Sequence, residues 1–425
     1  MSAQVEKHSG SEGETRSCAT ELVCRTCGYR APLREAVFRC PDCSIGFDID
    51  YDYELARERV AEVDFAARPM NLWRLEELLP IVSAEAKARV GRFSGQTPLI
   101  RADRLGAELG LKNLYVKDDS TNRPSLSYKD RVVGMAVARA LELGCKEIGC
   151  VSTGNVGTAT AALAAKAGLR PYIFYPANLE RAKARSCRAL GAEVCQLDGN
   201  YDEANNACRE FALETGLEFA NITLRPFYAE GAKTLAFEVV EELGWSSPDH
   251  IVMPAAGGTL SSRVHKGLQE LEAVALAETA QTKLHIGQPT GCSPIAAAIA
   301  EGSEIVPQKP ETLAHSLAIG APGDGPLVLD AVRSRGGASA AIPDGEIITA
   351  MELLAATEGV LTEPAGGTTV AATMKLAQRG VLKPEDTVVI VISGNGLKTL
   401  SEQPIRPWPE GVPCSTAAME EVVTE

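Results

Sequence analysis

The alternation of strand-like and helix-like segments constrains the fold of this chain more than any other feature. Short apolar runs recur between stretches with helical periodicity, and Gly168 and Gly191 follow two of those stretches, where helix ends favour a left-handed residue. Such units place their strands side by side in parallel sheets. We therefore expect an α/β fold with two open, mostly parallel twisted sheets and helices on both faces. The expected strands are 147–151, 171–175, 193–197, 250–253, 284–287 and 387–392, and the expected helices between the first of them are 156–167, 179–190 and 202–214.

The length of 425 residues exceeds the usual length of a domain with a single hydrophobic core, which indicates several domains. Residues 1–20 are polar and are expected to form a disordered tail, and the proline-containing, acidic end is expected to lie on the surface. The expected parts are the tail 1–20, a metal-binding ribbon at 21–48, a large α/β domain from 49–130 and 225–402, a small α/β domain at 131–224, and a surface tail at 403–425.

Charge and hydropathy exclude two classes of partner. The net charge of -14 argues against an extended nucleic-acid surface, which would need a concentrated basic face. No apolar run approaches the roughly 20 residues that span a bilayer, and residues 1–16 lack the apolar core of a signal peptide. We expect a cytoplasmic protein that binds neither membranes nor nucleic acid.

Four of the cysteines form two CxxC pairs close to the start of the chain. Four thiolates at this spacing can enclose one Zn²⁺ tetrahedrally, and such a closed shell is structural because no position remains for water. The alternative is a ribbon that has kept the cysteines but no longer loads metal. The predicted ligands are Cys24, Cys27, Cys40 and Cys43.

Lys129 stands at an expected helix start in the run Ser-Tyr-Lys-Asp-Arg at 127–131. Glycine-containing turns at 152–155, 254–259 and 393–398 each follow a strand-like run. Open parallel sheets bind ligands beyond the carboxyl ends of their strands, so these turns are expected to meet in one crevice. A lysine amine that holds an aldehyde as a Schiff base, together with a glycine-lined turn for a phosphate, indicates pyridoxal phosphate as the cofactor.

Two of the turns carry side chains suited to that cofactor. In the second, Gly257 and Gly258 let backbone amides converge on a phosphate, and Thr259 adds a hydroxyl donor. In the third, Ser393 would face the pyridine nitrogen, which a hydroxyl leaves largely unprotonated. The alternatives are a plain helix-capping turn at 257–259 and a plain turn serine at 393.

Seven short motifs give the chain a resemblance to threonine synthases, which are pyridoxal-phosphate enzymes related to tryptophan synthase β chains. The resemblance runs from the ribbon to about residue 398. It implies conversion of O-phosphohomoserine and water to L-threonine and phosphate, with a small-molecule amino-acid substrate and a homodimer as the typical assembly. The motifs are Gly-Gln-Thr-Pro-Leu at 95–99, Ser-Tyr-Lys-Asp-Arg at 127–131, Ser-Thr-Gly-Asn at 152–155, Tyr-Ala-Glu-Gly-Ala-Lys-Thr at 228–234, Ser-Leu-Ala-Ile-Gly at 316–320, Glu-Pro-Ala at 363–365 and Ser-Gly-Asn-Gly-Leu-Lys at 393–398.

The resemblance also implies roles for single residues. Lys129 would form the Schiff base, and Asn155 would hydrogen-bond the phenolic oxygen of the cofactor. For the phosphate of the substrate, the guanidinium of Arg131 could donate two hydrogen bonds, and Ser152 and Thr153 could add hydroxyl donors. The alternative for Arg131 is a surface helix arginine paired with a carboxylate.

The chain departs from many threonine synthases at two motifs. Those enzymes read Ser-Phe-Lys-Asp-Arg-Gly and Ser-Thr-Gly-Asn-Thr-Ser, whereas this chain has Tyr128, Val132, Val156 and Gly157. The missing hydroxyls at 156 and 157 remove two donors to a substrate phosphate. A related enzyme that performs β-replacement or β-elimination on O-phosphoserine or another activated serine or threonine is therefore a second hypothesis. A non-enzymatic protein whose ribbon binds a partner is a third.

Overall fold

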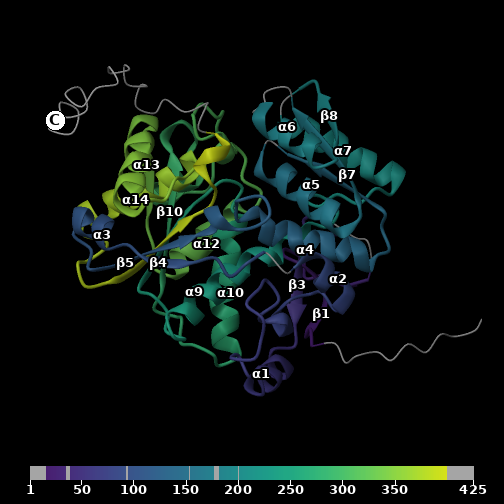
Figure 1. The fold of residues 1–425 in the computed structure, drawn as a ribbon, viewed down its shortest axis with the longest axis horizontal. Coiled ribbons are helices and arrows are strands. Elements are labelled where there is room, and N and C mark those ends of the chain that lie inside the picture. Colours follow the sequence, from purple (N-terminus) through teal and green to yellow (C-terminus); the bar gives the residue numbers. More distant parts are fainter. Residues whose placement is uncertain are drawn as a thin grey trace, which may run out of the picture.

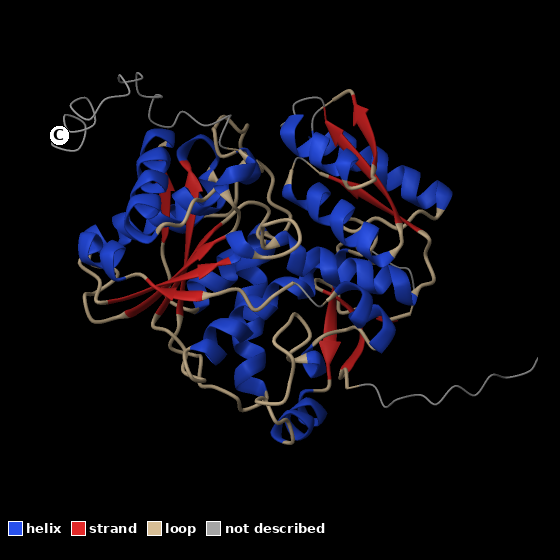
Figure 2. Ribbon diagram, viewed as in Figure 1, coloured by secondary structure: helices blue, strands red, loops and turns tan. Residues whose placement is uncertain are grey.

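The computed structural model describes residues 16–34, 39–91, 94–152, 154–176, 181–199 and 201–399. Within these ranges the chain forms one large sheet, one small sheet and a short sheet close to its start (Figure 2). The large sheet and the small sheet are mostly parallel and carry helices on both faces, which confirms the expected fold class.

The large sheet has six strands in the order β11-β10-β9-β12-β5-β4. All neighbouring pairs are parallel except β4 and β5, which are antiparallel. The central strands β9 and β12 are buried on both faces, which explains why they stand out in the sequence as continuous apolar runs. The strands are β4 Leu99–Arg101, β5 Asn113–Asp118, β9 His250–Pro254, β10 Lys283–Pro289, β11 Ser339–Ile342 and β12 Thr387–Ile392.

Strand β12 shows how the sheet divides the core. Val389 and Val391 pack in one apolar cluster with residues of α9 and α10, whereas Val388, Ile390 and Ile392 pack in a second cluster with residues of α3, α13 and α14. Successive side chains of a strand point to opposite faces, so one strand contributes to both layers. The helices around this sheet are α3 Asp103–Leu109, α8 Arg225–Glu230, α9 Thr234–Glu242, α10 Thr259–Ala273, α11 Pro294–Glu301, α12 Gly325–Ser334, α13 Asp344–Glu358 and α14 Pro364–Gln378.

The small sheet has three parallel strands in the order β6-β7-β8 and lies apart from the large one, with α5, α6 and α7 around it (Figure 1). Gly168 and Gly191 have φ of 73° and 85°, so the expected left-handed glycines are present. The elements of this part are β6 Glu147–Val151, α5 Asn155–Ala167, β7 Arg170–Pro176, α6 Arg181–Ala189, β8 Glu193–Leu197 and α7 Tyr201–Thr215.

The ribbon is an antiparallel sheet in the order β2-β1-β3, formed by β1 Ala19–Cys24, β2 Arg30–Pro32 and β3 Phe47–Tyr51. Its strands begin before residue 21 and end after residue 48, so the sheet extends beyond the expected span at both ends. Three more helices lie in the body near the ribbon, namely α1 Tyr53–Ala61, α2 Ala84–Val90 and α4 Lys129–Glu142 (Figure 1).

A cluster of buried and partly buried charges joins the ribbon to helix α10. Asp48 of β3 accepts hydrogen bonds from Arg263 at 2.6 Å and from Lys266 at 3.1 Å. Burial alone would raise the pKa of Asp48, but the two cations hold that pKa well below its usual range. Glu230 lies at the centre of the same cluster and pairs with both cations.

The expected tails lie largely outside the described residues, which begin at 16 and end at 399. Among the helices that the structure describes, none combines the length and apolar character that crossing a membrane requires.

Candidate active site

A cavity of about 320 Å³ lies at the carboxyl ends of β6, β9 and β12. Residues of both parallel sheets line it, as expected for ligand sites in open α/β folds. The structure brings most of the predicted site residues together around this cavity, namely Lys129, Ser152, Asn155, Gly257, Gly258, Thr259 and Ser393.

Lys129 is the first residue of α4 and is partly buried. Its Nζ donates to the Tyr128 hydroxyl at 2.5 Å and lies 4.3 Å from the centroid of the Tyr128 ring. The Tyr128 amide donates to the Ser393 carbonyl at 3.0 Å, and Ser127 forms a bridge with Gly394. These bonds fix the start of α4 against the turn after β12, so the lysine amine and Ser393 face one cavity.

The turn after β9 has the backbone of an anion cradle. Gly258 has φ of +99°, a left-handed conformation that favours glycine, and α10 begins at the next residue. The amides of that first turn have no partner within the helix and favour an anion. A Cβ on Gly258 would come within 2.9 Å of the Asp324 backbone carbon, whereas a Cβ on Gly257 would meet no protein atom within 4 Å. Gly258 therefore forms the turn, and Gly257 keeps open the space in front of it.

Arg225 is a charged residue of this cavity that sequence reasoning missed. It lines the cavity, and its Nη2 donates to the Thr259 hydroxyl at 2.7 Å. The same nitrogen pairs with Asp324, whose carboxylate also accepts from Thr259 at 3.1 Å. Arg225 lies three residues before the motif at 228–234 and belongs to none of the quoted motifs, and the packing of α8 against α10 brings it to the cradle.

Asn155 begins α5 and is held by two charged side chains from distant parts of the chain. Its Nδ2 donates to Glu363 at 2.6 Å, and its Oδ1 accepts from Lys398 at 2.8 Å. Glu363 and Lys398 belong to the motifs at 363–365 and 393–398, but we predicted no role for either residue from the sequence. Because Lys398 occupies the carbonyl oxygen, the amide is oriented with its N–H groups as donors.

Ser152 organises the turn before α5. Its Oγ accepts from the amide of Gly154 at 3.0 Å and from that of Gly157 at 2.9 Å. The hydroxyl hydrogen therefore remains the group with which Ser152 can donate. Thr153 lies outside the described residues.

The departures from the family motif at positions 156 and 157 have packing reasons. A Cβ on Gly157 would come within 3.1 Å of the Ile173 side chain, so a hydroxyl-bearing residue would be crowded there. Val156 packs against two apolar clusters, although it also borders the cavity.

Arg131 does not reach the cavity, and its predicted contact with a substrate phosphate is wrong. The side chain is fully buried, and all three of its guanidinium nitrogens donate within the protein. Its carboxylate partners are Asp119 and Glu238, and its hydroxyl partners are Thr97 and Thr234. Residue 131 lies two positions after Lys129 on α4, so it points away from the face that Lys129 presents to the cavity. The surface location that we considered as the alternative is also excluded.

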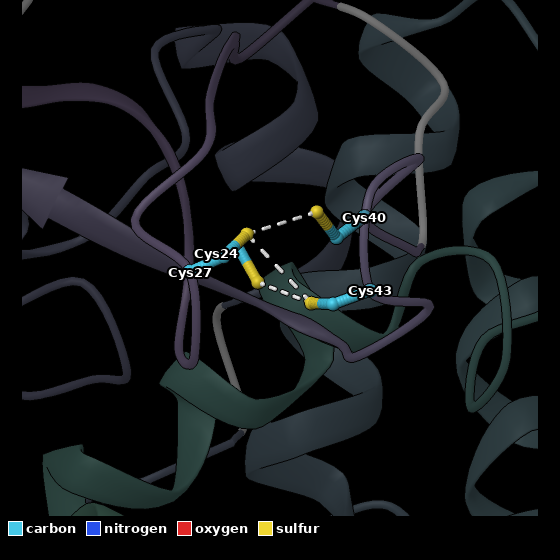
Figure 3. A group of neighbouring side chains, drawn as sticks. All are labelled: Cys24, Cys27, Cys40 and Cys43. Atoms are coloured by element: carbon cyan, nitrogen blue, oxygen red, sulfur yellow. Dashed lines mark hydrogen bonds between the residues drawn. The ribbon is translucent and has the colours of Figure 1, made fainter.

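The four cysteines of the ribbon form one cluster in which the sulfurs point toward one another (Figure 3). All four Sγ atoms lie within 4.8 Å of one another, and the shortest separations are 3.4 Å for Cys24–Cys43 and for Cys27–Cys40. Four sulfurs at about 2.3 Å from a central zinc would lie ~3.8 Å apart. The cluster therefore has the donors and the size for one tetrahedral metal ion.

The matching family model is that of the pyridoxal-phosphate dependent enzymes, and it covers residues 90–394. Threonine synthase of Methanocaldococcus jannaschii is 34% identical over 411 residues, which is 95% of this chain and 99% of that relative. Threonine synthase of Methanosarcina acetivorans is 33% identical over 381 residues, with 89% and 92% of the two chains covered. Threonine synthase of a Bacillus species is 36% identical over 310 residues, with 73% and 85% covered.

Solved structures with the same fold include maize serine racemase, with a TM-score of 0.62, 24% identity, and coverage of 75% of this chain and 94% of that one. The structure of O-ureido-L-serine synthase gives a TM-score of 0.61 and 22% identity, with 80% and 100% covered. At these identities the likeness concerns the fold.

Proposed function

Since the chain belongs to the threonine synthase family of pyridoxal-phosphate dependent enzymes, we propose that it converts O-phosphohomoserine and water to L-threonine and phosphate. The reaction breaks a carbon–oxygen bond, so the protein is a lyase of amino-acid biosynthesis. The main support for the proposal is that Lys129, the turn 257–259 and Ser393 all line one cavity between the sheets.

The residues around the cavity suit the cofactor of the family. Lys129 would hold its aldehyde carbon, and Gly257, Gly258 and Thr259 would hold its phosphate at the start of α10. Ser393 would face the ring nitrogen, and the N–H group of Asn155 that points away from Glu363 would donate to the phenolic oxygen. When bound, pyridoxal phosphate draws electrons from the carbon atoms of the substrate next to its amine.

The Lys129 amine would then move protons at the α and β carbons of the substrate, because its Nζ faces the cavity where those carbons would lie. Phosphate leaves from the γ carbon, which gains a proton and becomes the methyl group of threonine, and water adds at the β carbon, which has lost a proton. With Arg131 excluded, Ser152 and the amides at the start of α5 are the groups that we assign to the substrate phosphate. Thr153 remains a proposed donor beside them.

The cysteine cluster is proposed to hold a structural Zn²⁺, since Cys24, Cys27, Cys40 and Cys43 leave no position for water. We also propose a homodimer in the cytoplasm. None of the eleven cysteines in the described part of the chain forms a disulfide, in keeping with a reducing compartment.

Phosphate release from O-phosphohomoserine, measured beside O-phosphoserine with identification of the amino-acid product, tests the proposed reaction. We expect threonine and phosphate from the first substrate and much slower release from the second. Preferred turnover of O-phosphoserine would instead support the β-replacement or β-elimination hypothesis, which the missing hydroxyls at 156 and 157 favour. Lys129→Ala should abolish both the yellow colour of the bound cofactor and turnover, and a variant with unchanged turnover would contradict either reaction.

A further inference from the structure

Asp324 lies directly behind the proposed phosphate cradle. Its amide donates to the Gly257 carbonyl at 2.9 Å, and its carboxylate accepts from the Thr259 hydroxyl at 3.1 Å. The residue is 3% exposed. A buried carboxylate at this place would repel a phosphate dianion unless its charge were neutralised.

Two arginines from different parts of the chain pair with it, one at each carboxylate oxygen. Arg225 approaches from the cavity wall, and Arg25 approaches from the ribbon, where its Nη1 donates to Asp324 Oδ1 at 2.9 Å. Burial alone would raise the pKa of Asp324, but Arg225, Arg25 and Arg263 lower it to about 2, so the carboxylate is ionised at neutral pH.

Arg25 is held by both halves of the cysteine cluster. It lies inside the first CxxC pair, between Cys24 and Cys27, and its Nε donates to the Gly46 carbonyl at 3.3 Å just beyond the second pair. Its side chain is 19% exposed. A metal ion that fixes the two pairs relative to one another would therefore also fix the guanidinium that neutralises Asp324.

The ribbon also contacts helix α10 directly. Asp48 pairs with Arg263 and Lys266, both on α10, the helix whose first turn is the cradle. Ribbon contacts thus reach both the carboxylate behind the cradle and the body of the helix that begins at the cradle.

We propose that Arg25 is a positioning residue for the cofactor phosphate: by neutralising Asp324 it makes metal binding in the ribbon and pyridoxal phosphate binding in the cavity mutually dependent. The inference rests on the proposed cradle at 257–259 and not on the identity of the substrate. Linkage requires the coupling to act in both directions, so the cofactor should also retain the metal.

The test is the affinity of Arg25→Gln for pyridoxal phosphate, measured by titrating cofactor-stripped enzyme and following the visible absorbance. We expect affinity about tenfold weaker than that of the unaltered protein, within the usual range of coupling between two sites. Zinc content and melting temperature, measured on the same samples, should stay close to those of the unaltered protein. Arg25→Lys should recover part of the affinity because it keeps the charge.

Arg30→Gln is the matched control. It removes the same charge from the same ribbon, but Arg30 pairs only with Glu21 and Asp50 of the ribbon among the contacts described, and its side chain is 53% exposed. We expect its cofactor affinity to be unchanged. An unchanged affinity in zinc-loaded Arg25→Gln, or an equal loss in Arg30→Gln, would overturn the inference.

A reciprocal measurement needs no variant. At equilibrium with a competing chromogenic chelator, the unaltered holoenzyme should bind zinc several-fold more tightly than the cofactor-stripped form, since the coupling of two binding free energies is reciprocal. Equal zinc affinities would overturn the inference while leaving the proposed reaction intact. If the unaltered protein bound no pyridoxal phosphate at all, the proposed function would fail and this inference with it.

Discussion

At the scale of single residues, Arg131 is part of the core that supports the site. Its guanidinium bridges Asp119 and Glu238, and all three side chains are buried. Arg131→Lys keeps the charge but cannot fill the planar, multidentate site. We expect a loss of about 1.5–3 kcal/mol in the free energy of unfolding, as typical for lost hydrogen bonds to charged groups. Urea unfolding gives that value. KM for O-phosphohomoserine should not change. A raised KM with unaltered stability would instead indicate that Arg131 contacts the substrate phosphate.

Glu238 makes the same network sensitive to acid. Burial alone would raise its pKa, but Arg131 and Lys117 lower it to about 2, below the ordinary value of 4.5. Because the folded-state pKa is depressed, the stabilisation is complete above about pH 4.5 and is lost as the pH falls toward about 2. Unfolding free energies measured between pH 7 and 2 should show this loss. In Glu238→Gln the stability at pH 7 should be lower and its fall in acid shallower. A parallel pH profile in the variant would contradict this assignment.

At the scale of elements, substitution of the two glycines of the cradle should affect stability and cofactor affinity differently. Gly257→Ala puts a methyl group into open space in front of α10, so stability should hold while affinity for pyridoxal phosphate falls by about tenfold or more. Gly258→Ala combines a left-handed φ with contact against Asp324 and Val328, and should therefore also lose roughly 1–3 kcal/mol of stability. Melting temperatures and cofactor titrations of both variants separate the effects. Gly244→Ala, at φ of +73° with no atom within 4 Å, is the control for backbone strain alone.

The elements also show what local sequence can reveal. The expected strand 147–151 matches β6, and 387–392 matches β12, because continuous apolar runs between turn residues carry their own signal. Strand β4 has only three residues, pairs antiparallel at the sheet edge, and has no such signal. Lys129 and the glycine turns were predictable because strand ends in parallel sheets converge. The position of Arg131 and the role of Arg225 depend on contacts with residues from distant segments of the chain. A local sequence motif carries no information about such contacts.

At the scale of the whole molecule, the ribbon is part of the folded body. Asp48 is the ribbon partner of Arg263 and Lys266, and Tyr51 donates to Glu230 at 2.8 Å within the same buried cluster. If the ribbon unfolded, the buried guanidinium of Arg263 would lose a carboxylate, and breaking a buried ion pair from one side commonly costs about 3–5 kcal/mol. The stabilities of ribbon and body should therefore be linked.

Cys40→Ser tests that linkage by removing one metal ligand. A structural zinc site contributes its binding free energy to folding, so the variant should lose zinc and melt at a lower temperature. Because the buried pairs couple the parts, calorimetry should show the main unfolding transition of the body shifted downward, and no separate ribbon transition beside an unaltered body. Cys195→Ser, which changes an exposed thiol of the small sheet, is the control and should leave zinc content and melting temperature unchanged. A body transition that stays in place after zinc loss would mean that the ribbon is an appended module, and the buried charges between Asp48 and α10 would then have to find other partners or water.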